Sequence, residues 1–580
     1  MEKSLFPLII ILTLSGFLSS CGKKWLEVRP EDTVDQYKLA NEEGINALLV
    51  GAYSLLDGVN NHFGWESASS NWLYGDIRGL IANEGTDAGD SWGGTSIKSY
   101  SETATNQSLN VKWREIYEAV ARCNTTILVI NQAVEDGNIT GDQADLFLKQ
   151  ARALRGWYHF EAWRMWNMIP YVDENTDQNT LTNTEDIRDK IIADLEEGTE
   201  LPDDMGAIGR FNGTVSKVLM AKALMQMNHD YTGALPLLAD VKANGEKPDG
   251  SPIGLAPTYG EIFDIENRNG IEAVYTVQYS VNDGSNGFNG GYGEVLNFPY
   301  KSGGSPGGCC GFFQPTQEYV NSFRTSAGLP LLDGSYNNDP VISDQGLKPT
   351  DPFTEDTGPL DPRLDWSAGR RGIPYWDWGV HTGSDWMRDQ SHAGPYSTKK
   401  QVYKKSQEGI YTDVSGWTSG YTANGYRMIR YADILLLLAE CQIETNDLAD
   451  ARTNINLVRA RAANSDGWVK ETDGITNAAN YVISKYPSSG YPFNNQTNAR
   501  TALYMERKLE LGMEGHRWFD LNRWGITVEE LNRILDYEKT MPWSNTMYHG
   551  TWTVVGPEDV TYPIPQQQID LSNGRLVQNR

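Results

Sequence analysis

Aromatic side chains that lie close to Asn, Asp and Arg are the residues of this sequence best suited to a chemical task. A sugar ring has one face of C–H groups, and an indole or phenol ring can cover that face while polar neighbours bond the hydroxyls at its rim. We expect the rings that do this to lie on loops that neighbouring helices hold in place. The candidate ligand-binding residues are Asn71, Trp72, Asp90, Trp92, Tyr292, Arg370, Tyr375, Trp376, Trp378 and Trp386.

Packing is the competing interpretation for any single loop tryptophan, because loop-rich regions need small cores of their own. Tryptophans at helical positions are expected to be core residues. These are Trp157, Trp163, Trp166, Trp518 and Trp524. Among the loop aromatics we expect at least one ring to be open to solvent.

Histidine spacing and glycine-rich motifs are common signatures of catalysis and of cofactor binding. The seven histidines show no HExxH spacing, and GxxxxGK[ST] does not occur. Gly303 to Gly307 reads GxSxG, but this glycine-rich stretch has no helical or strand period, so it is not a nucleophile elbow between a strand and a helix. Asp173 to Asp177 begins like a calcium loop, but Gln178 and Thr184 stand where that loop needs glycine and glutamate. We expect no metal site and no cofactor. A glycosidase that uses a pair of loop carboxylates remains an alternative, because sequence distance does not reveal how far apart two carboxyl groups lie.

Two loop-rich stretches carry the candidate aromatics. Residues 57–108 are rich in Gly, Asn, Ser and Asp, and residues 281–425 hold 23 glycines and five of the 18 tryptophans. Disordered chains are poor in aromatic residues, so we expect ordered loops. A long irregular segment inside a folded chain is usually functional. Residues 281–425 are therefore predicted to be a loop-rich ligand-binding insert.

Helices must hold these loops in place. Apolar residues at three- and four-residue steps predict helices over 37–56, 111–134, 184–197, 214–227, 231–241, 426–445, 447–462 and 499–513. Thr140 and Gln143 form a capping box for another helix, which stops before Pro170. The facing apolar stripes of 426–445 and 447–462 predict a helical hairpin. Periodicity alone supports helical hairpins without a clean 34-residue repeat.

The chain begins like an exported protein. A short basic start and an apolar run too short to span a bilayer precede Cys21, so residues 1–20 are predicted to be a signal peptide. Small residues before Cys21 resemble a bacterial lipobox, in which that cysteine carries the lipid. An ordinary secretory signal is the alternative. Export permits disulfides, so the adjacent Cys309 and Cys310 can form a bridge.

The charge of the chain limits its partners. The net charge is -27, and removal of the predicted signal peptide leaves it unchanged. A phosphate backbone would be repelled, which disfavours nucleic acid. Acidic polymers are disfavoured more weakly, because local patches can override the mean. Composition therefore favours a neutral ligand.

Five stretches, in order along the mature chain, resemble the SusD/RagB family of glycan-binding lipoproteins of Bacteroidetes. The resemblance rests on Cys21 to Pro30, Gln150 to Phe160, Ile429 to Glu440, Arg507 to Leu521, and Tyr562 to Pro565 with Gln578-Asn579. It implies an all-α fold in which about four tetratricopeptide-like helix pairs form a scaffold and a large loop-rich lobe packs against it. The shared motifs are scaffold motifs, so no ligand-binding residue is carried over.

The resemblance also implies a role without catalysis. The protein would be lipid-anchored through Cys21 in the outer membrane, facing the exterior, and would deliver oligosaccharide to a SusC-like TonB-dependent transporter. We divide the chain into a signal peptide (1–20), an N-terminal region with helical hairpins and aromatic loops (21–280), the insert (281–425) and C-terminal hairpins with an extended tail (426–580). The alternatives are a glycoside hydrolase with two loop carboxylates and a helical-hairpin scaffold that binds protein.

Overall fold

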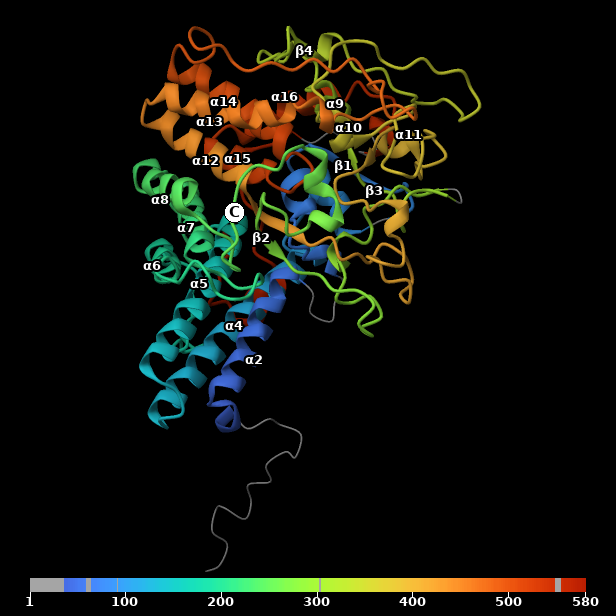
Figure 1. The fold of residues 1–580 in the computed structure, drawn as a ribbon. Helices are drawn as coiled ribbons and strands as arrows, with labels where there is room; N and C mark the ends of the chain where they lie inside the picture. Colours follow the sequence, from blue (N-terminus) through green and yellow to red (C-terminus); the bar gives the residue numbers. More distant parts are fainter. Residues whose placement is uncertain (1–35, 59–63, 91, 302–303, 548–553) are drawn as a thin grey trace, which may run out of the picture.

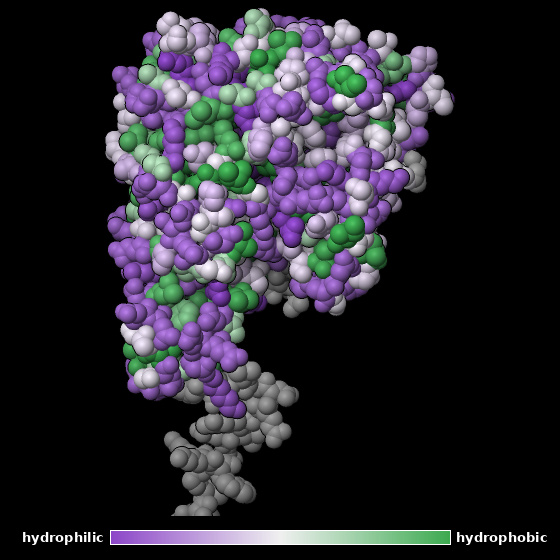
Figure 2. Space-filling view, in the orientation of Figure 1, coloured by the Kyte–Doolittle hydropathy of each residue, from purple (hydrophilic) through white to green (hydrophobic). Residues whose placement is uncertain are grey.

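The computed structural model describes residues 36–58, 64–90, 92–301, 304–547 and 554–580. The predicted signal peptide and Cys21 lie outside these residues. The described chain is mostly helical with a few short strands, as predicted. Within the same ranges no helix combines the length and apolar character needed to cross a membrane. Figure 2 shows one face, which is largely hydrophilic with separate hydrophobic patches.

The scaffold is a series of helices, each packed on its neighbour. The contacts run from α4 through α5, α6, α7 and α8 to α12, which also packs against α13 and α14. In Figure 1 this series passes from α2 and α4 at the bottom to α12, α13 and α14 at the top left. The main helices are α2 (Glu42–Tyr53), α4 (Gln107–Glu135), α5 (Gly141–Trp166), α6 (Arg188–Gly198), α7 (Gly213–Asn228), α8 (Tyr231–Asn244), α12 (Tyr431–Glu444), α13 (Leu448–Ala462), α14 (Gln496–Leu511), α15 (Arg517–Trp524) and α16 (Thr527–Glu538).

Polar side chains set the starts of several helices. The predicted capping box at α5 is confirmed: the Gln143 backbone N–H donates to Thr140 Oγ1, and the Thr140 N–H donates to Gln143 Oε1. Asn212 and Asn495 cap α7 and α14 by accepting a backbone N–H three residues on. Each cap satisfies a donor that the first helical turn leaves unpaired.

The predicted helix 426–445 is wrong at its start. Tyr426–Arg430 is a strand, β8, that pairs antiparallel with β2 (Ala273–Val277), and α12 begins at Tyr431. Ile429 continues the apolar period of α12, so local spacing did not separate the two elements. The partner strand lies some 150 residues earlier in the chain and leaves no mark on local periodicity. Helix α15 contains Trp518 and Trp524, which the sequence placed at helical positions, whereas α16 was not predicted. The tail, expected to be extended, contains a short helix, α18 (Gln566–Leu571).

The second lobe consists of loops held by short elements (Figure 1). Strand β1 (Ala82–Gly85) pairs with β3 (Phe312–Pro315), β4 (Thr325–Ser326) with β5 (Leu329–Pro330), and β6 (Ala368–Gly369) with β7 (Ser397–Thr398). The short α-helices are α3 (Gly93–Lys98), α9 (Gln317–Asn321), α10 (Leu364–Ser367), α11 (Gln390–Ala393) and α17 (Ser544–Met547). The remaining short helical turns include η4 (Gly64–Glu66), η5 (Trp72–Ile77) and η8 (Tyr292–Glu294).

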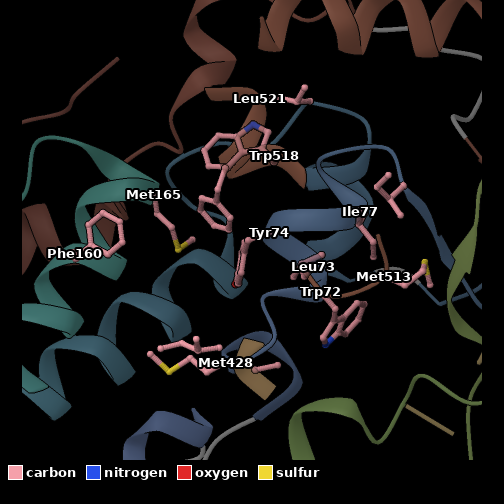
Figure 3. Packing of buried hydrophobic residues seen from close by; sticks show 14 of the residues in the cluster. Trp72, Leu73, Tyr74, Ile77, Phe160, Met165, Met428, Met513, Trp518 and Leu521 are labelled. Carbon is pink, nitrogen blue, oxygen red and sulfur yellow. The ribbon is translucent and has the colours of Figure 1, made fainter. Parts of the chain in front are cut away.

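A shared core joins the lobe to the scaffold. Figure 3 shows Trp72 and Tyr74 of the lobe near Phe160 of α5, Trp518 of α15 and Met428 of β8, and all five side chains are buried. Burial of large rings contributes roughly 1.5–3 kcal/mol each. The loops are therefore anchored on the helices from beneath.

Candidate functional site

Five rings from three loop segments form a continuous array, which we call the aromatic platform (Trp65, Phe288, Tyr292, Trp417 and Tyr421). Tyr292 is its centre. Its ring centroid lies 5.6 Å from that of Trp65, 5.5 Å from Phe288 and 5.7 Å from Tyr421, with interplanar angles of 22–23°. Trp417 meets Tyr421 edge-on at 6.2 Å. Offset-stacked and edge-on pairs at such distances are favourable arrangements of aromatic rings.

Exposure differs along the platform. Phe288 is 51% exposed and Trp417 is 57% exposed, whereas Trp65 and Tyr292 are half-buried and Tyr421 is buried. The buried and half-buried rings hold the array together, and the outer rings offer apolar surface to solvent. Contiguous exposed apolar surface, unlike scattered single apolar residues, is typical of interaction sites. The platform is therefore the candidate ligand-binding surface.

Two glycines create the slot that holds the Tyr421 ring. A Cβ at Gly287 would lie 2.7 Å from that ring, and one at Gly416 would lie 2.5 Å from it. Gly287 also has φ +86°, a conformation that L side chains rarely adopt. Any other residue at either position would push the ring away from Tyr292.

The loop that carries Trp417 is braced from two sides. The Gly291 N–H donates to Thr422 O at 2.8 Å, and the Asp413 N–H donates to Tyr421 O at 2.9 Å. On the other side Ser419 Oγ donates to Gly307 O at 3.3 Å. Gly307 belongs to the loop that ends at Cys309 and Cys310. These two cysteines form the adjacent disulfide that the sequence permits.

Polar groups surround the rings. The Asp283 carboxylate accepts the Ser285 N–H at 2.9 Å and Asn289 Nδ2 at 2.8 Å, and the Asp413 carboxylate accepts the N–H groups of Asn282 and Ser415. We call these side chains the polar rim, and groups of this kind can form hydrogen bonds to a hydroxyl-rich ligand.

The two carboxylates of this rim are poor candidates for general acids. Hydrogen bonds from Ser285 lower the pKa of Asp283, and hydrogen bonds from Ser415 lower the pKa of Asp413. A glycosidase needs one carboxyl group with a raised pKa so that it is protonated when the bond breaks. Neither Asp283 nor Asp413 therefore suits the role of the acid in hydrolysis.

Five of the ten sequence-predicted residues are buried. Asn71 Nδ2 donates to Glu161 Oε2 at 3.0 Å, and Trp72 Nε1 donates to Gly293 O at 2.9 Å. Arg370 Nε donates to Asp365 Oδ1 at 2.6 Å. The buried residues are Asn71, Trp72, Arg370, Tyr375 and Trp386. Their rings and polar groups are used within the fold, so we do not place them in the candidate site.

The other five predicted residues are half-buried and lie in different places. Tyr292 is the centre of the aromatic platform. Trp92 packs on Trp72 at 5.9 Å, and Asp90 forms an ion pair with Arg388 at 2.9 Å. Trp378 Nε1 donates to Tyr403 O at 2.8 Å, and Trp376 lines a separate hollow described below.

Sequence reasoning missed four members of the platform, namely Trp65, Phe288, Trp417 and Tyr421. Phe288 stands between Gly287 and the pair Asn289-Gly290, and Trp417 follows Gly416. A single ring among glycines has few neighbours of its own to pack against, and that local signal could have identified both residues. The prediction instead favoured Trp376-Asp377-Trp378, where two tryptophans lie close together in the sequence.

A buried carboxyl group beside Trp92 gives a pH-dependent prediction. Glu84 is 3% exposed, and burial raises its pKa to about 8 although a hydrogen bond from Thr95 and the charge of Lys98 oppose that rise. An acid whose folded pKa is raised makes the fold less stable as pH rises from its unfolded value near 4.5 to about 8.

Glu84→Gln should remove that loss. As pH rises from 5 to 8, we expect the free energy of unfolding of Glu84→Gln to increase relative to that of the wild type, by an amount on the order of a few kcal/mol. Urea denaturation at four or more pH values measures it. A difference in the free energy of unfolding between Glu84→Gln and the wild type that does not change with pH would contradict the raised pKa of Glu84.

The chain was compared with known proteins. A family model described as the SusD family matches residues 271–580, and one described as starch-binding associating with outer membrane matches residues 24–216. The SusD-like protein P25 of Formosa agariphila is 23% identical over 92% of this chain and 90% of its own length. A SusD-like protein of Bacteroides ovatus is 19% identical over 47% of this chain and 49% of its own length.

Solved structures share the fold. A laminarin-binding SusD-like protein superposes with a TM-score of 0.64 at 19% identity, covering 93% of this chain and 99% of its own. Surface glycan-binding protein A of Bacteroides thetaiotaomicron, solved in complex with laminarihexaose, gives 0.63 at 20% identity with the same coverage. With one family model spanning the C-terminal half and relatives aligned over nine-tenths of the sequence, the chain belongs to the SusD family.

Proposed function

We propose that this protein binds a neutral oligo- or polysaccharide on its aromatic platform and does not cleave it. The observation that carries the proposal is the stacked array around Tyr292, with Phe288 and Trp417 half open to solvent. Rings of this kind cover the C–H faces of successive sugar units, and the polar rim bonds their hydroxyls.

Family membership and the rim chemistry support this proposal. Two proteins of the same fold bind laminarin or its hexasaccharide, a neutral glucan. The net charge of -27 favours an uncharged ligand over an acidic one. The lowered pKa values of Asp283 and Asp413 argue against either of these two residues as a general acid.

Isothermal titration with a panel of glycans tests the proposal, beginning with laminarin and including neutral xylans and mannans and one acidic polymer. We expect a neutral glycan to bind with a dissociation constant between about micromolar and millimolar, because an open surface leaves much of the sugar hydrated. Prolonged incubation with that glycan should release no reducing ends. Their release would favour the hydrolase alternative, and failure of every glycan would favour the protein-binding scaffold.

The location and the partner are the second part of the proposal. We infer that Cys21 carries a lipid, that the protein faces the exterior from the outer membrane, and that it passes glycan to a SusC-like TonB-dependent transporter. Lipidation attaches a protein to a bilayer without a spanning helix. Replacement of Cys21 with Ala should move the protein from the membrane fraction to the soluble fraction. A wild-type protein that fails to co-purify with an outer-membrane barrel would contradict the transporter partner.

A further inference from the structure

We propose that the protein has a second saccharide-binding site, separate from the aromatic platform. A hollow of about 470 Å³ lies among residues 258–264, 366–377, 399–404 and 466–470, and none of the residues that line it belongs to the platform. Small-molecule pockets have volumes of roughly 300–1,000 Å³. We call this hollow the tryptophan pocket, because Trp366, Trp376 and Trp468 line it.

The three indoles are half-buried and held in fixed orientations. Trp366 Nε1 donates to Gly467 O at 2.8 Å, and the Trp366 and Trp376 rings meet edge-to-face at 4.9 Å. Trp468 Nε1 donates to Ala462 O at 3.0 Å. Gly260 packs against the Trp366 ring so closely that a Cβ there would overlap it. Rings that are already fixed lose little conformational freedom when a ligand binds.

Trp376 occupies its position at a cost. Its φ is +50°, in the left-handed region that bulky residues avoid, and its indole N–H is buried with no hydrogen-bond partner among the described residues. Each feature destabilises the folded state. The next tryptophan, Trp378, has neither defect, because its N–H reaches Tyr403 O. Strained residues that persist in a fold are concentrated at functional sites such as ligand-binding positions. The strain at Trp376 is therefore consistent with a ring that forms one wall of a binding pocket.

The charges around the pocket identify the class of ligand. Lys404 is paired with Asp264, Lys470 Nζ donates to Asn477 Oδ1 at 2.6 Å, and Lys399 Nζ donates to two backbone carbonyls. The lysines of the lining are Lys399, Lys404 and Lys470, and its acidic residues are Glu261, Asp264, Asp377 and Asp466. With no excess of positive charge, the pocket is unsuited to a phosphate or a uronate. Donors, acceptors and indoles together suit a short neutral saccharide.

The test uses the Phe288→Ala/Trp417→Ala double variant, in which the platform is impaired. Neutral trisaccharides with β-1,3, β-1,4 or α-1,4 linkages are titrated at millimolar concentration, and tryptophan fluorescence and saccharide-observed NMR report binding. We expect residual binding that falls at least fivefold when Trp468→Ala or Trp376→Ala is added. The matched control is Ile475→Ala, since Ile475 is an 81% exposed apolar residue in the same C-terminal segment and its loss should change nothing.

The outcomes separate this inference from the proposed function. Residual binding that Trp468→Ala does not weaken would overturn the proposed pocket site and leave the proposed platform site intact. The absence of any residual binding in the double variant would have the same meaning. Binding that is lost in Trp468→Ala but unaffected by the double platform variant supports the pocket and overturns the platform. Crystals of the wild type soaked in the trisaccharides provide a check without mutation: saccharide density between Trp376 and Trp468 supports the pocket, and density confined to the platform overturns it.

Discussion

Simultaneous replacement of Phe288 and Trp417 with alanine should weaken glycan binding at least tenfold and leave the fold intact. Both rings are more than half exposed, so their removal opens no cavity, and surface substitutions change stability by about 0.5 kcal/mol or less. Phe288 and Trp417 are the platform rings that a ligand can reach from solvent, and truncation of an aromatic anchor in a binding surface costs more than about 1 kcal/mol. Two such losses exceed the 1.4 kcal/mol that corresponds to a tenfold change in affinity.

Titration with the glycan that binds the wild type most tightly measures the effect, and thermal unfolding of the same samples reports on the fold. Ile410→Ala is the matched control, because Ile410 is apolar, 65% exposed and lies in a neighbouring loop. Wild-type affinity in the double variant would show that the ligand binds elsewhere. A large fall in melting temperature would show instead that the two rings are structural.

Buried rings explain why the platform could be predicted only in part from the sequence. Trp72 and Trp386 lie in loop-like stretches just as Trp417 does, yet both are buried. Trp72 is part of the core shared with the scaffold, and Trp386 is part of a smaller core within the lobe. Whether a loop tryptophan points inward depends on segments far away in the chain: Trp72 donates to Gly293, 221 residues later. Composition therefore predicted an aromatic face, and only the three-dimensional fold shows which loop rings lie at the surface and which are buried.

The scaffold was easier to predict because its signals are local. Apolar spacing and a capping box predicted α5, and the structure confirms both. Strand β8 was mistaken for the start of a helix because its hydrogen-bond partners are in β2, far away in sequence. Local periodicity thus predicts elements that bury one face, and it fails for short elements whose stability comes from a distant partner.

The second large effect concerns Glu510, which lies in α14 at the centre of a buried ionic cluster. Its carboxylate accepts Arg461 Nη2 at 2.5 Å, Arg363 Nη1 at 3.1 Å and Arg430 Nη1 at 3.1 Å. Arg430 also pairs with Glu272, so the cluster ties β8 to the segment before β2. Burial opposes ionisation of Glu510, but the three guanidinium groups hold its pKa well below the usual value.

Glu510→Ala should therefore destabilise the protein by about 3–5 kcal/mol, because it leaves buried guanidinium groups without their shared partner. Asp536→Ala is the control: Asp536 pairs with Lys539 at 3.0 Å but its side chain is 75% exposed, and surface pairs contribute about 0–1 kcal/mol. Urea denaturation at pH 7 measures both variants, and similar effects in the two would contradict a structural role for the cluster.

The pH dependence provides an independent check of the same cluster. A carboxyl group with a depressed folded pKa stabilises the fold fully above its unfolded value near 4.5, and that contribution is lost as pH falls below it. The wild type should therefore lose stability between pH 5 and pH 3 more steeply than Glu510→Ala. Since the cluster joins α14 to the strand pair beneath the lobe, its loss should also loosen the base on which the loops of the aromatic platform rest. If the platform binds glycan as proposed, glycan affinity should fall together with stability in this variant.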